Sequence, residues 1–234
     1  MDDHQDIASV GNRDWLAVGW FTPDYRPLAA RFANNLAQHA IPYHLFARDK
    51  IGNGWDTRQK PSVVLEAMKR YPGRTVVLMD VDCIVKDDIE PITRITTDIA
   101  VSVKARQLRK GRAWQKQIAV VVGSRVAVFR PTNGARTFLQ EWERQCRGAH
   151  YSGDETSMAW AYLLRPEVTS TQLDRRFAGS EVTAAPIPGL VVAHESVHDR
   201  STGHSISLFL RSLEKRYLRT GRTKAHMAQK TTIG

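Results

Sequence analysis

The pattern of hydrophobic and polar positions predicts that the first 85 residues alternate between strands and helices. Apolar runs at residues 14–21, 42–47 and 74–85 are short and continuous, which is typical of buried strands. Between them, residues 25–40 and 62–71 repeat apolar side chains at helical spacing, and Pro61 leads into the second helix. This β-α-β-α-β order predicts an α/β domain with a mixed, mainly parallel sheet flanked by helices. Ligands bind such sheets at the carboxyl ends of their strands.

The second half of the chain continues with less regular elements. Residues 97–103 predict a strand, and residues 117–130 predict two strands separated at Gly123 and Ser124. Helices are expected from about residue 134 to 147 and from Ser152, with capping residues, to 164. Late strands are expected at residues 182–187 and 190–193, the second running into His194. No apolar run of 18 residues is present, so no spanning helix is expected.

The strongest candidate for chemistry is the end of the third strand, Asp80-Val81-Asp82. Side chains two positions apart on an extended strand face the same way, so the two carboxylates can point at one object. They repel each other unless a cation lies between them, and Mg²⁺ and Mn²⁺ prefer such oxygen ligands. The pattern therefore predicts a metal site that serves a phosphate. The alternative is an ordinary strand-ending turn, in which Asp is common.

The net charge of +10 is concentrated in two segments, and the rest of the chain is slightly acidic. Residues 104–116 contain six basic residues and no acid, and residues 205–234 contain seven basic residues against Glu214. The loop at 104–116 is either a solvated loop or a site for an anionic acceptor or donor phosphates. Apolar positions recur at helical spacing in the second segment, which predicts a basic amphipathic helix that docks on the domain or contacts an anionic membrane. We therefore expect one domain at residues 1–204 and a separate helix and tail at 205–234.

The N-terminus is acidic and polar, and the two cysteines are too few for a disulfide framework. Both features favour a cytoplasmic protein, peripheral on the inner membrane face if its C-terminal helix contacts lipid.

The order of these features resembles the metal-dependent nucleotide-sugar glycosyltransferases of the GT-A fold, and more narrowly the nucleotide-diphospho-sugar transferases. The resemblance covers about residues 14 to 200 and implies a Rossmann-like catalytic domain. It is carried by Thr22-Pro23 after the first strand, Lys60-Pro61 at a helix start, Asp80-Val81-Asp82, the segment Val128–Thr132 before a helix, Gly153-Asp154-Glu155 at the start of another, and His194.

The resemblance implies roles on the donor side of the reaction. Asp80 and Asp82 would bind Mn²⁺ or Mg²⁺ and, through it, the diphosphate of a nucleoside-diphosphate sugar. His194 would be a third metal ligand. Thr22 would lie beside the nucleotide and Lys60 near the donor phosphates. The family usually has an aromatic residue after the late His, whereas Glu195 follows here, and His198 is a rival ligand.

The resemblance also implies that Asp154 and Glu155 face the donor sugar or the acceptor, which makes them the catalytic candidates. A carboxylate there could deprotonate the acceptor hydroxyl. Relatives often have Asp-Gln at this helix start, so Glu155 is a departure. The two acids could instead only stabilise the helix N-terminus through its dipole. The sequence does not identify the acceptor.

Two other functions are compatible with parts of the sequence. Phosphatases of the haloacid-dehalogenase type also end a strand in Asp-x-Asp, but near the N-terminus and with Thr or Val where Ile84 stands here. Asp80 would then be the nucleophile. The net charge suggests an anion-binding or nucleic-acid-binding protein, yet no RRM, KH or helix-turn-helix pattern is present, so nucleic acid is not an expected partner.

Overall fold

The computed structural model describes residues 5–50, 57–108, 117–148, 153–177, 179–180 and 187–194. The chain divides into two compact units, residues 1–196 and 197–234, and every described residue belongs to the first. The expected amphipathic helix at 205–234 and residues 109–116 of the expected basic loop lie outside the described residues. Residues 104–108, which were expected to begin that loop, are instead the end of a strand. Among the helices that are described, none is both long and apolar enough to cross a membrane.

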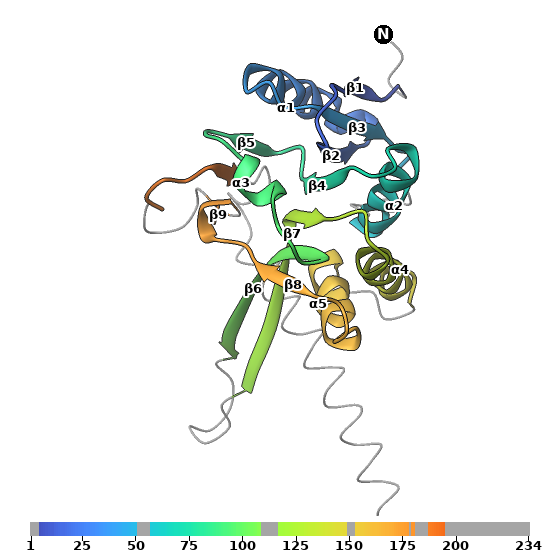
Figure 1. The fold of residues 1–234 in the computed structure, drawn as a ribbon, viewed down its shortest axis with the longest axis vertical. Coiled ribbons are helices and arrows are strands. Elements are labelled where there is room, and N and C mark those ends of the chain that lie inside the picture. The colour runs from blue at the N-terminus through green and yellow to red at the C-terminus, as the bar shows by residue number, and fades with distance from the viewer. Residues whose placement is uncertain are drawn as a thin grey trace, which may run out of the picture. The chain divides into compact units, whose positions relative to one another are not determined.

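The centre of the described unit is a seven-stranded sheet in the order β1-β3-β2-β4-β7-β6-β8 (Figure 1). Its strands are β1 (Ile7–Ser9), β2 (Trp15–Phe21), β3 (Tyr43–Ala47), β4 (Thr75–Met79), β6 (Ile99–Leu108), β7 (Gln117–Phe129) and β8 (Ser170–Gln172). Five of the seven run in one direction, and β1 and β7 run against them. The mixed, mainly parallel sheet predicted from the sequence is confirmed.

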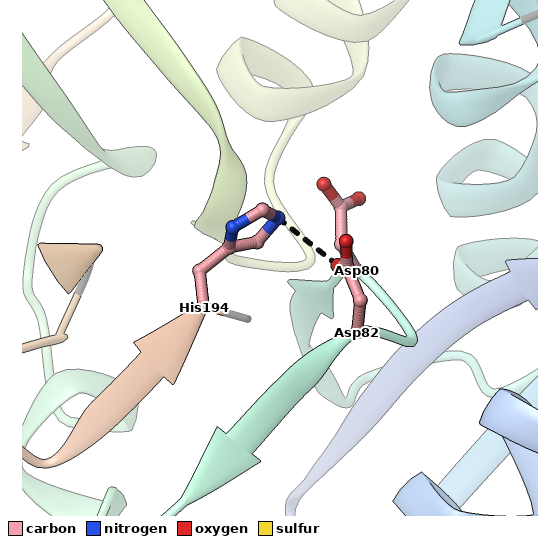
Figure 2. Close-up of side chains that lie close together, drawn as sticks. All are labelled: Asp80, Asp82 and His194. Carbon is pink, nitrogen blue, oxygen red and sulfur yellow. Dashed lines mark ion pairs between the residues drawn. The ribbon is translucent and has the colours of Figure 1, made fainter. Parts of the chain in front are cut away.

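A second, three-stranded sheet lies beside the end of β4. It consists of β5 (Cys83–Val85), β10 (Val192–His194) and β9 (Gly179–Ser180), with β10 between the other two. The chain passes from the large sheet to the small one through a turn in which the Cys83 amide donates to the Asp80 carbonyl at 2.9 Å (Figure 2). The expectation of one extended strand through Asp80 and Asp82 is therefore wrong, and the turn that was the alternative is present.

The turn lies close to β2, and Gly19 makes this possible. A Cβ at Gly19 would stand 2.9 Å from the Met79 carbonyl oxygen and 3.4 Å from a methyl of Val81. Any larger residue would push the end of β4 away from β2.

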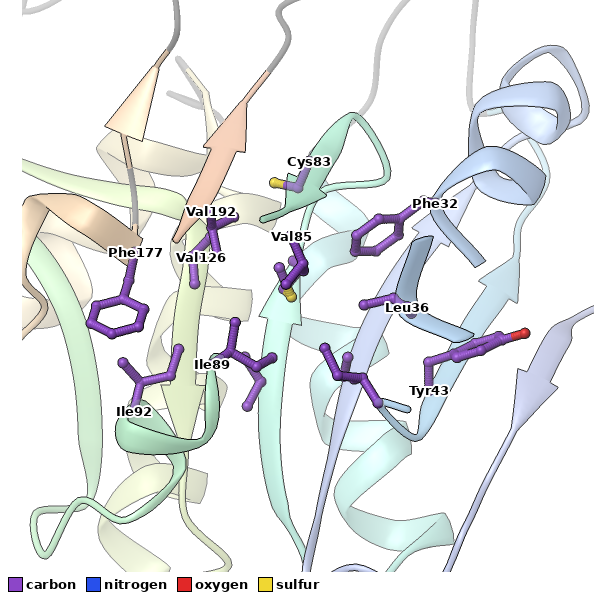
Figure 3. Packing of buried hydrophobic residues seen from close by; sticks show 14 of the residues in the cluster. Phe32, Leu36, Tyr43, Cys83, Val85, Ile89, Ile92, Val126, Phe177 and Val192 are labelled. Atoms are coloured by element: carbon purple, nitrogen blue, oxygen red, sulfur yellow. The ribbon is translucent and has the colours of Figure 1, made fainter. Parts of the chain in front are cut away.

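The two faces of the large sheet are covered by different layers. One face carries α1 (Arg26–Gln38), the short α3 (Glu90–Thr93) and the small sheet, which enclose apolar side chains such as Phe32, Val85 and Val192 (Figure 3). The other face carries α2 (Lys60–Arg70), α4 (Asn133–Arg147) and α5 (Asp154–Leu164) around Phe129 and Trp142. The alternating apolar residues of β2 and β4 divide between these two cores, as buried strands require.

Strand β7 is one continuous strand, so the prediction of two separate strands is wrong. The interruption at Gly123 and Ser124 is an irregularity in its pairing: Val101 of β6 faces Ala127, but Ser102 faces Gly123. Residues 124–126 are thus left out of the β6 ladder. They are held instead at the end of β4, where the Asp80 amide donates to the Arg125 carbonyl at 3.0 Å. The irregularity brings Ser124 and Arg125 to the acidic turn.

The late elements were predicted only in part. The expected strand at residues 190–193 corresponds to β10, which begins two residues later and ends one residue later. Most of the expected strand at 182–187 lies outside the described residues. Strand β8 was not predicted, since its three residues give no periodic signal. The expected side-chain cap of α5 is not formed: Gly153 is the N-cap residue, with a positive φ of 125°.

Candidate metal and donor site

Three side chains gather at the junction of the two sheets. Asp80 follows β4 directly, Asp82 precedes β5 directly, and His194 is the last residue of β10. The antiparallel pairing of β10 with β5 sets His194 opposite Cys83, the neighbour of Asp82. One potential ligand atom from each of the three residues lies within 4.8 Å of the others, and Figure 2 shows a ring nitrogen of His194 facing the two carboxylates.

Two atoms of this cluster lie within hydrogen-bonding distance but do not form a hydrogen bond. His194 Nε2 lies 3.0 Å from Asp82 Oδ1, with both side chains about nine-tenths buried. Nevertheless, among the residues that the structure describes, Asp82 Oδ1 has no hydrogen-bond partner, and neither has His194 Nδ1. Buried polar atoms without partners are costly, and a cation between the carboxylates and the imidazole would satisfy the acceptor atoms that converge there. The residues present therefore fit a bound divalent ion.

Lys60 lies deep in the same region. Its side chain is only 5% exposed, and its Nζ lies 2.8 Å from Asp80 Oδ1 and 2.7 Å from Asp154 Oδ2. It also donates to Ser124 Oγ at 3.2 Å. Lys60 was expected near the donor phosphates. In the structure its ammonium group lies between two carboxylates.

The charges of this network act on one another. Burial alone would lower the pKa of Lys60, but the carboxylates of Asp154 and Asp80 outweigh it and raise that pKa above its usual range. Burial raises the pKa of Asp154, yet Lys60 and the hydrogen bond from Ser124 bring it below its ordinary value. Asp80 keeps a raised pKa because its burial, together with the nearby charges of Asp82 and Asp154, outweighs the effect of Lys60.

Asp154 and Glu155 are adjacent in α5 but differ in their surroundings. Asp154 accepts hydrogen bonds from Ser124 Oγ at 2.5 Å and from Thr57 Oγ1 at 3.1 Å, in addition to its ion pair with Lys60. Glu155 is half-buried and forms no hydrogen bond or ion pair with the described part of the chain. Burial, and then the charge of Asp154, raise the pKa of Glu155.

Sequence reasoning missed Ser124, Thr57 and Arg125. The only available signal was the small polar pair Gly123-Ser124 inside an apolar run, which was interpreted as a break between strands. Arg125 is half-buried, and its charge lowers the pKa values of Glu155 and Cys83 against the larger effect of their burial. Its guanidinium makes no hydrogen bond or ion pair with the residues that the structure describes. It is a cation near Glu155 and Cys83 whose donors are not used by the described part of the chain.

The remaining candidates lie elsewhere or cannot be placed. Thr22 stands at the carboxyl end of β2, next to β4 in the sheet, and its hydroxyl donates to Asp24 at 2.5 Å. That bond does not connect it to the acidic cluster. The rival ligand His198 lies outside the described residues.

Comparison with known proteins supports the fold. No protein-family profile and no curated protein sequence matches the chain. A crystal structure of a glycosyltransferase involved in the glycosylation of the major capsid of PBCV-1 matches with a TM-score of 0.53 at 10% identity, over 78% of this chain and 94% of that one. The glycosyltransferase GlyE of Streptococcus pneumoniae TIGR4 matches with a TM-score of 0.51 at 12% identity, over 89% of this chain and 64% of that one. The chain therefore has the fold of the GT-A glycosyltransferases, with an acidic Asp80-x-Asp82 group at the junction of its two sheets.

Proposed function

We propose that this protein is a metal-dependent glycosyltransferase that moves a sugar from a nucleoside-diphosphate donor to an acceptor. The observation that carries the proposal is the convergence of Asp80, Asp82 and His194 in a chain with the GT-A fold, where the buried Asp82 Oδ1 has no hydrogen-bond partner among the described residues. A nucleoside diphosphate leaves with accumulated negative charge, and a cation bound at this site would stabilise that charge.

Asp80, Asp82 and His194 would hold the ion, which we propose to be Mn²⁺ or Mg²⁺. Two carboxylates suit either ion, and the imidazole favours Mn²⁺ over Mg²⁺. When bound, the ion supplies Lewis-acid stabilisation of the leaving diphosphate. Arg125 would bind the same diphosphate, because a guanidinium with available donors matches phosphate oxygens. Thr22, at the carboxyl end of the neighbouring strand β2, remains our candidate beside the nucleotide.

Of the two catalytic candidates, we propose Glu155 as the carboxylate that receives the proton of the acceptor hydroxyl. Two observations support this choice. Glu155 has no partner within the described residues, and its pKa is raised, which makes it the better base. Asp154 has both carboxylate oxygens occupied by Thr57, Ser124 and Lys60. We propose that Asp154 positions the start of α5 and takes no part in the proton transfer.

A thermal-shift screen of UDP, GDP and ADP with and without Mn²⁺ tests the proposal. We expect one nucleotide to raise the melting temperature only when Mn²⁺ is present, because binding to the folded state stabilises it. Metal-dependent release of phosphate from p-nitrophenyl phosphate, without a nucleotide effect, would instead favour the phosphatase alternative. A stabilising effect of oligonucleotides alone would favour nucleic-acid binding.

The segment 205–234 is proposed, from its sequence alone, to contact anionic lipid through a basic amphipathic helix. Sedimentation with phosphatidylserine vesicles tests this. The full chain should sediment and the chain truncated after residue 204 should not, whereas equal sedimentation of both proteins would reject the contact.

A further inference from the structure

Lys60 connects four separate segments at the site. It begins α2, its ammonium contacts Asp80 at the end of β4 and Ser124 in the irregular part of β7, and it pairs with Asp154 at the first residue of α5. An ammonium group has three donors, and these three acceptors use all of them. Lys60 therefore has no donor left for a phosphate in this arrangement.

Asp154 is fixed in a position from which it acts on the metal cluster only through its charge. Its Oδ1 accepts from Thr57, its Oδ2 accepts from Ser124 and pairs with Lys60, and its backbone carbonyl accepts from Trp142 Nε1 at 3.0 Å. Asp154 is not part of the group formed by Asp80, Asp82 and His194.

The two carboxylates of the metal cluster and the Lys60–Asp154 pair together balance one divalent ion. When ionised, Asp80, Asp82 and Asp154 carry three negative charges, and Lys60 carries one positive charge, which leaves a net charge of −2. Without Asp154, the ammonium group would belong to Asp80 alone and would neutralise one of the two carboxylates available to the metal. Because Lys60 pairs with Asp154 as well as with Asp80, its positive charge neutralises Asp80 only in part.

We propose that the Lys60–Asp154 ion pair sets the metal affinity of the site without contacting the metal. The pair positions Asp80 through the ammonium group while Asp154 compensates its charge, so that Asp80 and Asp82 together present two negative charges to the ion. This inference rests on the metal site of the proposed function, and it assigns to Lys60 and Asp154 a role in tuning that site.

Four proteins test the proposal: the wild type, Asp154→Asn, Lys60→Met and the double variant. The Mn²⁺ dissociation constant is measured without nucleotide, at low ionic strength, from the electron paramagnetic resonance signal of free Mn²⁺. Asp154→Asn changes the net charge to −1 and should weaken binding by roughly tenfold, whereas Lys60→Met changes it to −3 and should tighten binding by a similar factor. The double variant returns to −2 and should bind within about threefold of the wild type.

Ser124→Ala is the matched control. It removes the hydrogen bonds that Ser124 forms with Lys60 and with Asp154, and it leaves every charge in place. It should bind Mn²⁺ within about threefold of the wild type. If Lys60→Met fails to fold, Asp154→Asn and the double variant still decide the question, since the double variant removes both buried charges of the pair together.

Each outcome has one meaning. Recovery of wild-type affinity in the double variant, after a loss in Asp154→Asn, supports the pair as a determinant of metal affinity. Equal affinity of Asp154→Asn, Ser124→Ala and wild type overturns the inference and leaves the pair purely structural, while the proposed function stands. Absence of Mn²⁺ binding by the wild type removes the metal site, and with it both the inference and the proposed function.

Discussion

His194 Nε2 lies 3.0 Å from Asp82 Oδ1, yet the two atoms do not share a hydrogen bond. An isolated imidazole–carboxylate pair that is this close and this buried would normally orient to form one, since an unmade bond in the interior costs free energy. The arrangement is instead typical of two ligands directed at a common third atom. It distinguishes His194 from a histidine that merely follows a strand.

Replacing His194 should therefore weaken metal binding. We expect His194→Asn to raise the Mn²⁺ dissociation constant by at least about tenfold and to reduce the preference for Mn²⁺ over Mg²⁺, because the nitrogen ligand is lost. Calorimetric titration with each ion measures both effects. His39→Asn, at the end of α1, is the control and should bind as the wild type does. Unchanged affinity in His194→Asn would assign the third ligand to another residue.

Loss of either acidic ligand should abolish metal-dependent nucleotide binding while the fold is kept. In Asp82→Asn only one of the two acidic ligands keeps its negative charge, and the Mn²⁺-dependent thermal shift with a nucleoside diphosphate should disappear. Asp80→Asn should give the same result, with circular dichroism confirming the folded state. A nucleotide shift that survives in both variants would contradict the assignment of Asp80 and Asp82.

Removing the charge of Glu155 should slow the chemical step and leave nucleotide binding nearly unchanged. Glu155→Gln should lower the turnover of sugar transfer, or of donor hydrolysis, by about 10²–10⁴-fold with little change in nucleotide affinity, as expected for a general base. Steady-state kinetics separates the two effects. Equal turnover in Glu155→Gln and the wild type would exclude the proposed role.

The pH profile gives an independent readout of Glu155. A base must be ionised to act, and burial beside Asp154 raises its pKa above the usual 4.5 of a glutamate. Turnover should therefore fall as the pH decreases through that raised pKa. This acidic limb should be absent in Glu155→Gln and present in Ser124→Ala, which keeps the carboxylate.

A second pH effect is expected in stability, from the other end of the sheet. His44 on β3 is hydrogen-bonded to Asp6 at 2.7 Å and to Tyr71 at 2.6 Å, and burial lowers its pKa below 6.5 despite the opposing effect of Asp6. Since the unfolded chain then binds a proton more readily than the folded one, stability is complete above pH 6.5 and is lost as the pH falls. Denaturant unfolding should show a lower free energy of unfolding at pH 5.0 than at pH 7.5. His44→Gln should lose less between the two values, and an equal loss would contradict this origin.

The sequence predicted the parts of the fold that depend on local pattern. The alternation of strands and helices up to Val85, and the candidate chemistry of Asp80 and Asp82, follow from periodicity and from the placement of carboxylates at a strand end. The pairing of Lys60 with Asp154 left no such signal, because it depends on how α2 and α5 pack against the same sheet face. Ser124 and Arg125 reach the site through a shift in strand register, and register is set by partners distant in sequence.

The turn between Asp80 and Cys83 has a mechanical consequence. Asp80 and Asp82 are two positions apart in sequence, but the turn places Asp80 at the end of the seven-stranded sheet and Asp82 at the start of a strand of the three-stranded sheet. His194 ends the neighbouring strand of that smaller sheet. An ion held by all three would be a cross-link between two sheets that are otherwise joined here by the turn and by their shared apolar core. Binding of the ion would then restrict motion of the small sheet relative to the large one. The flexibility of the small sheet would therefore differ between the metal-bound and the metal-free protein.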